Sequence, residues 1–338
     1  MTVRLSLALQ GGGAHGAFTW GVLDRLLQED GIEIAAMSGS SAGALNGAAI
    51  KAGLLAGGRQ GARDSLDALW RQVARSGDFR LGPWFAAAMP FAADWLAAWE
   101  DALPVSAAGI AGQVMSPYGF GPGWRNPLEP VVRRFDFSRI CASEGPALFV
   151  AATNVRTAKV KVFEGQDITP DALLASACLP TVFQAVEIGG EAYWDGGYAG
   201  NPALFPLYDA ELPDDLLIVR LNPLRREDVP RTPAEIHERI TEIAFTAPLL
   251  RDLRSIAFVK RLIASGRVPE GTMKDVRVHM IADDRLMEGL RPSSKLRPGA
   301  AFLWRLKRAG RAAAEGFLRR HGPDLGRAET LDLKAIYG

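Results

Sequence analysis

The alternation of apolar and polar positions along the chain predicts short strands separated by helices. The first such run, Val3-Arg4-Leu5-Ser6-Leu7-Ala8-Leu9, alternates as a strand with one buried face does. Comparable runs predict strands over residues 3–9, 32–38, 147–152, 159–163, 185–188, 191–194, 216–221 and 276–281, with helices between several of them. Strands that alternate with helices favour an α/β fold. We therefore expect a three-layer α/β/α sandwich whose mostly parallel central sheet is covered on both faces.

The first predicted strand runs directly into a glycine-rich loop, Gln10-Gly11-Gly12-Gly13-Ala14-His15-Gly16, and a helix follows. Consecutive glycines leave backbone N–H groups unobstructed, and the positive end of a helix adds to their attraction for negative charge. The loop therefore predicts an anion-binding site. Two anions fit such a site: a phosphate, or the oxyanion of an acyl-transfer intermediate.

A phosphate in this loop would require partners that the sequence lacks. Gly11-x-Gly13-x-x-Gly16 satisfies the dinucleotide-binding fingerprint, which also needs an acidic residue at the end of the second strand. That strand ends in Met37-Ser38, and Glu33 lies at its beginning. No Gly-Lys-Ser/Thr follows the glycines, as a Walker-type loop requires. The oxyanion is therefore favoured, and a nucleotide- or anion-binding module is the non-enzymatic alternative.

The second predicted strand leads into Ser38-Gly39-Ser40-Ser41-Ala42-Gly43, and an Ala- and Leu-rich helix to Ala56 follows. The pattern Gly39-x-Ser41-x-Gly43 between a strand and a helix is that of a nucleophile elbow, where the residues around a strained serine must be small. Isolated matches also occur in turns, where Ser and Gly act as helix caps. Ser41 is the candidate nucleophile.

The candidate base comes from Tyr193-Trp194-Asp195-Gly196-Gly197, which ends a predicted hairpin turning at Gly189-Gly190. Asp195 lies at the strand end, and the two glycines after it allow another backbone to approach closely. An Asp-Gly pair alone is a common turn. Burial beside the two aromatic residues would raise the pKa of Asp195 above its ordinary value of about 3.9, as a proton acceptor requires.

The glycine-rich loop, the serine elbow and the Asp-Gly-Gly motif, in this order, resemble those of the patatin-like phospholipase family. The segment Ser176-Ala177-Cys178-Leu179-Pro180 with Phe183, and Asn201-Pro202, are also similar to the family's context, and the resemblance spans roughly residues 5–205. The motif glycines are Gly11, Gly16, Gly39, Gly43, Gly196 and Gly197.

The resemblance implies an α/β/α acyl hydrolase that acts on lipids with a Ser–Asp dyad, without a catalytic histidine or a cofactor. By position it implies Ser41 as the nucleophile, Asp195 as its partner, and an oxyanion hole formed by the N–H groups of Gly12, Gly13 and Ala14. One departure concerns charge. The family usually has Arg or Lys before the last glycine of the loop, where this chain has His15, a side chain that titrates near neutrality.

A Ser-His-Asp triad would instead need one of the four histidines beside Ser41. His279, in the strand-like run 276–281, is the main candidate, although a histidine in a strand is more often structural. His15 is too constrained by the loop to act as a base, and His237 and His321 belong to solvated or basic helices. The sequence holds no His-Glu-x-x-His motif and no Cys-x-x-Cys pair, so we expect no metal.

The length of 338 residues and the net charge of +1 set broad limits. We expect a catalytic domain over 1–210, and an α/β extension over 211–338 that packs on the same core and ends in a basic amphipathic helix. The charge predicts no nucleic-acid partner. Cys141 and Cys178 are expected to be reduced thiols, and no signal peptide or transmembrane helix is apparent, so a cytoplasmic location is expected.

Two segments outside the motifs bear on substrate access. An insertion at about 82–125 is rich in aromatic residues and reads either as a small separate core or as a lid and acyl-chain pocket over Ser41. Residues 291–320 hold nine Lys or Arg against Glu315 alone. A helix from Ala300 would place Phe302, Leu306, Ala309, Ala313 and Phe317 on one face and Arg305, Arg308, Arg311 and Arg319 on the other. Packing on the protein and peripheral membrane contact are the two interpretations.

The sequence thus predicts a serine acyl hydrolase whose partner is a lipid ester substrate, with phospholipid or lysophospholipid implied by the resemblance. A general carboxylesterase or acyltransferase is the enzymatic alternative, since it would share the acyl-enzyme and differ in acceptor and pocket length. Acyl-chain length, head group and oligomeric state stay open at this point.

Overall fold

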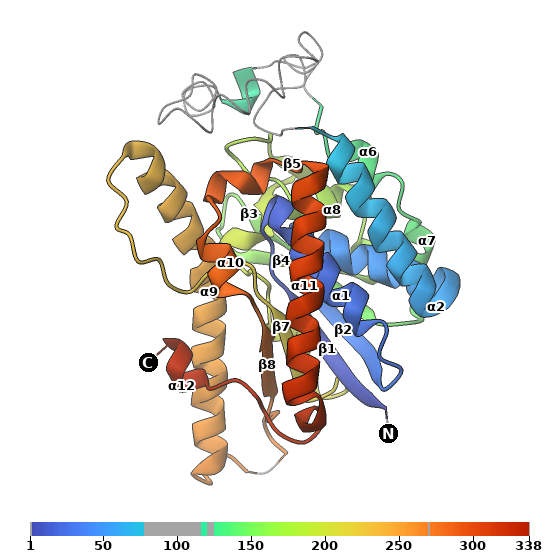
Figure 1. The fold of residues 1–338 in the computed structure, drawn as a ribbon, viewed down its shortest axis with the longest axis vertical. Helices are drawn as coiled ribbons and strands as arrows, with labels where there is room; N and C mark the ends of the chain where they lie inside the picture. The colour runs from blue at the N-terminus through green and yellow to red at the C-terminus, as the bar shows by residue number, and fades with distance from the viewer. Residues whose placement is uncertain (1, 78–115, 120–124, 270, 338) are drawn as a thin grey trace.

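The computed structural model describes residues 2–77, 116–119, 125–269 and 271–337, which fold around one sheet with helices on both faces (Figure 1). Each predicted strand is present, with its ends within two residues of the expected ones. The strands are β1 (Val3–Leu9), β2 (Ile32–Ser40), β3 (Ala147–Asn154), β4 (Val160–Glu164), β5 (Val186–Ile188), β6 (Glu191–Asp195), β7 (Asp215–Val219) and β8 (Arg277–Ile281).

The sheet has the order β5-β6-β3-β2-β1-β7-β8, with β4 also paired to β3. Its central run, from β3 through β2, β1 and β7 to β8, is parallel, whereas β4, β5 and β6 pair antiparallel. The expected α/β/α sandwich is confirmed, with an antiparallel corner added to a parallel centre. Strands β7 and β8, from the C-terminal part of the chain, extend this same sheet beside β1.

The register of β3 determines how two distant segments meet. Along β3, Ala151 pairs with Ser40 of β2, and the next residue, Ala152, pairs with Asp195 of β6. Strand β4 pairs with Phe149–Thr153 of β3 and so overlaps the positions paired with both β2 and β6. Because a strand has two edges, β2 and β6 must share the edge opposite β4, end to end. The end of β2 therefore abuts the end of β6.

Helices cover the two faces of the sheet in two groups. Leu5, Leu7 and Leu9 of β1 face a core formed with α1, α2, α8 and α11, and Ala8 faces a second core formed with α9. The helices of the described residues are α1 (Gly16–Leu26), α2 (Ala42–Arg75), α6 (Glu129–Val132), α7 (Phe137–Ile140), α8 (Pro170–Ser176), α9 (Pro233–Ala264), α10 (Asp284–Glu288), α11 (Ala300–His321) and α12 (Leu333–Tyr337).

Helix α2 is much longer than the sequence predicts. It bends at Gly57 and Gly58, whose φ/ψ angles are not helical, and then continues for nearly twenty residues to Arg75. Two consecutive glycines are a normal signal for a helix end. The chain resumes as a helix because Leu66 and Trp70 of the second half are buried against the sheet-facing core.

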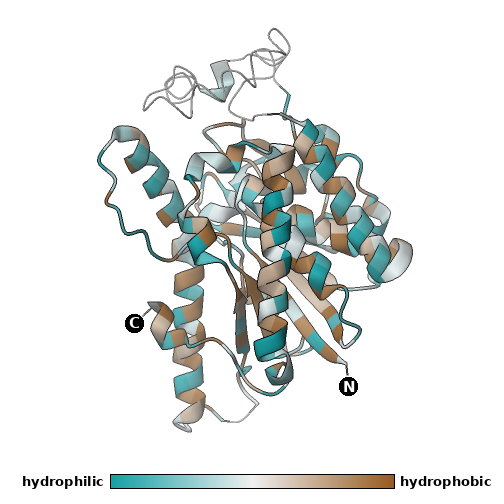
Figure 2. Ribbon diagram, viewed as in Figure 1, coloured by the Kyte–Doolittle hydropathy of each residue, from teal (hydrophilic) through white to brown (hydrophobic). Residues whose placement is uncertain are grey.

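Helix α11 packs along α1 and has the amphipathic pattern that the sequence predicts. Leu306 and Phe317 are buried, while Arg305, Arg308 and Arg319 are exposed. Figure 2 shows hydrophilic residues on the outward turns of this helix. Not every cation faces solvent, because Lys307 lies over the ring of Trp20 and bonds Asp67 at 2.7 Å, and Arg311 pairs with Asp24.

Some sequence expectations fall outside the described residues. Most of the aromatic-rich insertion, over 78–115 and 120–124, lies there, so its role as a lid stays a prediction. Of its aromatic residues, Tyr118 is described, and its hydroxyl accepts a hydrogen bond from the backbone of Ala185 at 3.0 Å. Within the described ranges, none of the helices combines the length and hydropathy that a membrane crossing would need.

Close packing of α1 on α11 predicts opposite effects of two glycine substitutions in one helix. A Cβ on Gly310 would overlap the backbone oxygen of Phe18, whereas a Cβ on Gly316 would meet nothing nearer than 3.9 Å. Gly310→Ala should lower the free energy of unfolding by about 1–3 kcal/mol because the helices must separate. Gly316→Ala should raise it by about 0.5–1 kcal/mol through helix propensity.

Urea unfolding of the two variants beside the unsubstituted protein measures both effects. Equal behaviour of the two variants would contradict this close approach of α11 to α1.

Candidate active site

Ser41 occupies a strained turn between β2 and α2. Its φ and ψ are 54° and −126°, and only one other described residue that is not glycine, Ala158, has a positive φ. Such a backbone conformation costs of order 1–3 kcal/mol and persists only where its surroundings hold it. The backbone N–H of Ser41 donates to the hydroxyl of Ser176 at 2.9 Å, and its carbonyl begins the hydrogen bonding of α2. The turn therefore has the conformation expected of a nucleophile elbow.

The small residues around Ser41 are required by contact with neighbouring backbone. A Cβ on Gly43 would overlap the carbonyl oxygen of Leu9, and one on Gly39 would lie 2.5 Å from the backbone of Gly43. The elbow is thus pressed against the end of β1, where the glycine-rich loop begins. On the other side, a Cβ on Gly16 would lie 2.5 Å from that of Ala42. The loop and the elbow are consequently packed together through their motif glycines.

Asp195 is brought to Ser41 by the shared edge of β3. Its backbone N–H donates to the carbonyl of Cys178 at 2.8 Å, and its carbonyl accepts from the hydroxyl of Thr153 at 2.8 Å. A Cβ on the following Gly196 would overlap the carbonyl of Ala151, so only glycine allows β6 to end here. These contacts fix the carboxylate at the point where β2 and β6 meet.

The Asp195 carboxylate is fully buried and only half hydrogen-bonded. Its Oδ1 accepts from the N–H of Gly197 at 2.8 Å, whereas Oδ2 accepts no hydrogen bond of standard geometry from the residues that the structure describes. Burial raises the pKa of Asp195 to about 7, against the opposing influence of the Gly197 N–H, the Ser41 hydroxyl and the Lys295 ammonium. The free oxygen and the raised pKa suit a group that accepts a proton from Ser41 near neutral pH.

The glycine-rich loop provides backbone N–H groups beside Ser41. The N–H of Gly11 is already bonded to the side chain of Asn201 at 2.7 Å. Those of Gly12, Gly13 and Ala14 have no acceptor among the described residues. Gly13 has a φ of +56°, which glycine adopts without strain and which turns the backbone as an anion-binding nest requires.

A pocket with mainly apolar walls opens beside Ser41. Gly13 and Ala14 of the loop line it together with Ser41, while Gly12 lies against Leu221, whose side chain would be 3.0 Å from an added Cβ. Of the three predicted oxyanion donors, two therefore border the pocket that holds Ser41. The other lining residues are Ala42, Leu45, Leu69, Trp70, Val73, Leu128, Ala177, Leu179, Phe183, Lys295 and Leu296.

His15 contributes no positive charge to the loop. It is buried, its ring nitrogen Nε2 lies 2.8 Å from the hydroxyl of Ser294, and its ring contacts Phe302 edge-on. Burial holds the pKa of His15 well below its usual value, and the charges of Lys295 and Arg226 lower it further. The side chain is thus neutral at physiological pH, and it supports the loop by packing.

His279, the alternative base for a triad, is engaged elsewhere. It is fully buried in β8, and its two ring nitrogens lie 3.0 Å from Asp215 and 3.0 Å from Thr330. Both ring nitrogens of His279 are therefore engaged by residues other than Ser41. This geometry favours a structural role for the histidine. Within the described ranges, no cluster of three His, Cys, Asp or Glu side chains suited to a metal ion occurs.

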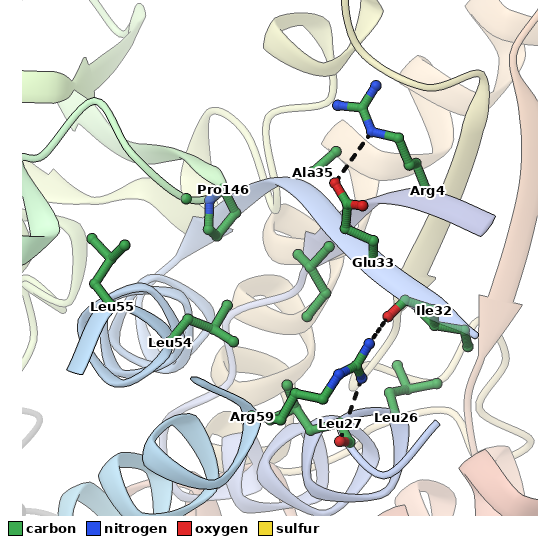
Figure 3. Close-up of a pocket in the computed structure, with 12 residues that line it drawn as sticks. Arg4, Leu26, Leu27, Ile32, Glu33, Ala35, Leu54, Leu55, Arg59 and Pro146 are labelled. Carbon is green, nitrogen blue, oxygen red and sulfur yellow. Dashed lines mark hydrogen bonds and ion pairs between the residues drawn. The ribbon is translucent and has the colours of Figure 1, made fainter. Parts of the chain in front are cut away.

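A second cavity, of about 470 Å³, lies at the other end of β2 (Figure 3). Its charged groups are already partnered: Arg59 donates to the carbonyls of Leu27 and Ile32, and Arg4 pairs with Glu33 at 3.4 Å. Ile32 to Ala35, at the start of β2, are among the residues that line it, whereas Ser41 follows the end of that strand. This cavity contains none of the predicted catalytic residues, so its size alone does not make it the candidate site.

Four residues support the site without having been assigned a role from the sequence: Ser176, Asn201, Asn222 and Lys295. Ser176 and Asn201 belong to segments that are similar to the family's, and this similarity could have indicated that they lie near the site. For Asn222 and Lys295 the sequence gives no such indication. They follow β7 and α10 in the chain, and Lys295 donates to the Asn222 side chain at 2.6 Å. No local motif connects these positions with Ser41.

A family model described as patatin-like phospholipase matches residues 7–208. VipD from Legionella pneumophila is 13% identical with a TM-score of 0.41, over 95% of this chain and 67% of that one. The ExoU-SpcU complex of the type III secretion system of Pseudomonas aeruginosa gives 17% identity and a TM-score of 0.31, over 99% of this chain and 74% of that one. The sequence has no significant match among curated proteins.

Burial of Asp195 predicts a variant that is more stable because it lacks the carboxylate. The folded protein holds a proton on Asp195 up to about pH 7, the unfolded chain only to about pH 3.9, so stability falls as pH rises between these values. Asp195→Asn can keep the bond to Gly197 and carries no charge. Between about pH 5 and pH 8, its stability relative to the unsubstituted protein should rise by about 2–3 kcal/mol.

Urea unfolding at the two pH values measures this change, with Asp64→Asn, at an exposed site, as the matched control. A difference that does not depend on pH would contradict the raised pKa of Asp195.

Proposed function

We propose that this chain, which belongs to the patatin-like phospholipase family, cleaves lipid carboxylic esters through an acyl-enzyme on Ser41, with Asp195 as its proton acceptor. Membership of the family supports the coarser statement that the protein is a lipid hydrolase. Phospholipids or lysophospholipids are the substrates we propose, and the cleavage of their carboxylic esters is the phospholipase A type of reaction.

One observation carries the proposal: Ser40, the residue before the strained Ser41, and Asp195 pair with consecutive positions along one edge of β3. The pairings of Ala151 with Ser40 and of Ala152 with Asp195 bring them together. A surface serine with a turn-forming aspartate would need neither the positive φ of Ser41 nor a buried, unpaired Oδ2. Both features cost stability, and both become useful if Ser41 attacks a carbonyl.

In the first stage, the Ser41 hydroxyl attacks the ester carbonyl while its proton passes to Asp195. The carbonyl oxygen becomes an oxyanion, to which the N–H groups of Gly13 and Ala14 can donate hydrogen bonds, with Gly12 behind them. Each such donor is worth about 2.7–4 kcal/mol of transition-state stabilisation in enzymes where it has been removed. The carbon–oxygen bond then breaks, and Asp195 returns the proton to the leaving alcohol.

In the second stage, water hydrolyses the acyl-enzyme. Asp195 accepts a proton from the water as it attacks the acyl carbonyl, the same N–H groups hold the second oxyanion, and the proton returns to Ser41 as the fatty acid leaves. Because the pKa of Asp195 is raised to about 7, proton transfer in both directions is near balance at neutral pH.

The apolar pocket supports a lipid acyl chain as the acyl group. Leucine, valine and aromatic side chains from α2 and from the segments around α6 and α8 line it beside Ser41. An acyl chain bound there would bury its own apolar surface and that of the pocket wall. This burial contributes about 25 cal/mol of binding free energy per Å² of apolar surface. Such a pocket favours a lipid over a small, polar ester.

Covalent labelling tests the assignment of the two residues. A fluorophosphonate probe should modify Ser41 in the unsubstituted protein, and Ser41→Ala should abolish both labelling and phospholipid hydrolysis. Asp195→Asn should lower both by at least about 10³-fold, since the proton acceptor is lost while the fold is kept. Mass spectrometry of the labelled peptide identifies the modified residue.

Ser255→Ala is the matched control, because this exposed hydroxyl of α9 donates to the carbonyl of Arg251 at 3.0 Å and is not among the residues that surround Ser41. Labelling at another serine, or full labelling of Ser41→Ala, would refute the proposed nucleophile. Binding of NAD or ATP without labelling would favour the anion-binding alternative.

We also propose that the protein contacts membranes peripherally through the exposed face of α11. Trp304 is 42% exposed, and Arg305 and Arg308 are exposed beside it. Phe302, in the same turn, lies against His15 of the glycine-rich loop. An aromatic residue flanked by cations is typical of helices that bind the interface of an anionic bilayer, and Phe302 connects this face of α11 to the site.

Co-sedimentation with vesicles containing phosphatidylserine checks this contact. Replacing Arg305 and Arg308 together by Gln should weaken binding by about 2 kcal/mol, or about thirtyfold, since each cation near an anionic surface contributes about 1 kcal/mol. Arg71→Gln, on α2, is the control. Equal binding of both variants and the unsubstituted protein would exclude this face.

A further inference from the structure

A lysine from the C-terminal part of the chain lies in the pocket beside Ser41. The short helix η6 (Pro292–Leu296) lies directly on the glycine-rich loop: a Cβ on Gly13 would overlap the carbonyl oxygen of Lys295, and the hydroxyl of Ser294 contacts His15 at 2.8 Å. Lys295 also lines the pocket together with Ser41, Gly13 and Ala14. The family model ends at residue 208, so this contact comes from outside the matched region.

The ammonium of Lys295 is held in place by one neutral partner. Its Nζ donates to Oδ1 of Asn222 at 2.6 Å. Asn222 is fully buried, and its backbone N–H is bonded to the side chain of Gln10 at 2.8 Å. Gln10 is the first residue of the glycine-rich loop. Gln10 thus holds Asn222, and Asn222 holds the ammonium of Lys295. These bonds fix the position of the charge relative to the loop.

The reaction creates a need for such a charge. Attack by Ser41 places a negative charge on the carbonyl oxygen in a site with apolar walls, where an uncompensated charge is costly. His15 is neutral, and the N–H groups of the loop supply only partial charges. Of the residues that line the pocket in the described part of the chain, Lys295 alone carries a cation.

We propose that Lys295 is the electrostatic positioning residue of this active site, a cation brought onto the glycine-rich loop from the C-terminal region to stabilise the negative charge of the Ser41–Asp195 reaction. The inference rests on the proposed function, because it assigns a role at the same serine. It makes the C-terminal region part of the catalytic unit.

The surroundings of Lys295 determine its titration. Burial lowers the pKa of Lys295 to about 8. The carboxylates of Glu242 and Glu238 on α9, and that of Asp195, raise it, whereas Arg226 after β7 lowers it; His15 faces it from the loop as a neutral ring. In return, the ammonium lowers the pKa of Asp195. The active form therefore has Asp195 deprotonated and Lys295 protonated, which gives a bell-shaped pH dependence with its maximum between about 7 and 8.

The test is the rate of fluorophosphonate labelling of Ser41 from about pH 6 to about pH 10, with the full chain. In the unsubstituted protein the rate should fall above about pH 8. In Lys295→Arg the fall should disappear, since a guanidinium stays charged over this range. In Lys295→Met the rate at pH 7 should drop by about 10- to 100-fold, and the acid limb should move to higher pH.

Asn222→Asp provides a second, independent variant. The Nδ2 of Asn222 makes no hydrogen bond with the described residues, so an aspartate there loses none. Its charge would stabilise the ammonium and move the alkaline fall upward by about one pH unit or more. A purely structural role for Lys295 would not shift the limb. This variant also keeps the test decisive if Lys295→Met fails to fold, which thermal unfolding reveals.

The inference would be overturned if Lys295→Arg and Asn222→Asp both kept the alkaline fall at the same pH as the unsubstituted protein. An unchanged labelling rate and pH profile in folded Lys295→Met would also overturn it. These outcomes leave the proposed function intact, since Ser41 is still labelled. Absence of labelling in the unsubstituted protein would instead overturn the proposed function and this inference with it.

Discussion

The site depends on one edge of β3, which is shared end to end by β2 and β6. The pairing of Ala151 with Ser40, and of the next residue with Asp195, converts two remote segments into neighbours at a fixed backbone separation. A shift of either strand by one residue would turn every side chain on it to the other face. Hydrogen bonds from the hydroxyls of Ser38 and Ser40 to the carbonyls of Ala203 and Gly200, both 2.5 Å, tie the strand end to the chain after Asp195.

Around this junction the protein keeps features that reduce its stability. A buried carboxylate whose Oδ2 accepts no hydrogen bond of standard geometry from the described residues is unfavourable, as is a serine with positive φ, and the surrounding packing holds both. The C-terminal region takes part through Phe245 of α9. The ring of Phe245 packs against Gly197, and its backbone carbonyl accepts a hydrogen bond from the side-chain amide of Asn201 at 3.0 Å. Lys295 completes the electrostatics. The chain beyond residue 208 therefore helps to build the site.

The sequence predicts what local patterns encode. The eight strands, the elbow at Ser41 and the turn at Asp195 all follow from alternation, small residues and glycine placement. Helix α2 was predicted too short because Gly57-Gly58 is a stop signal that tertiary packing of Leu66 and Trp70 overrides. Lys295 could not be predicted, since a lysine in a basic segment is ordinarily solvated. Its place on the loop depends on strand order, which places β7 beside β1 and the following chain over the glycines.

A crystal structure of the protein with a phosphonate bound to Ser41 tests the central claim most directly. The phosphonyl oxygen represents the oxyanion of the tetrahedral intermediate. We expect this oxygen about 2.7–3.1 Å from the N–H groups of Gly13 and Ala14, with Oδ2 of Asp195 directed at the modified serine. An oxygen turned away from the glycine-rich loop, or an Asp195 side chain that points away from Ser41, would contradict it.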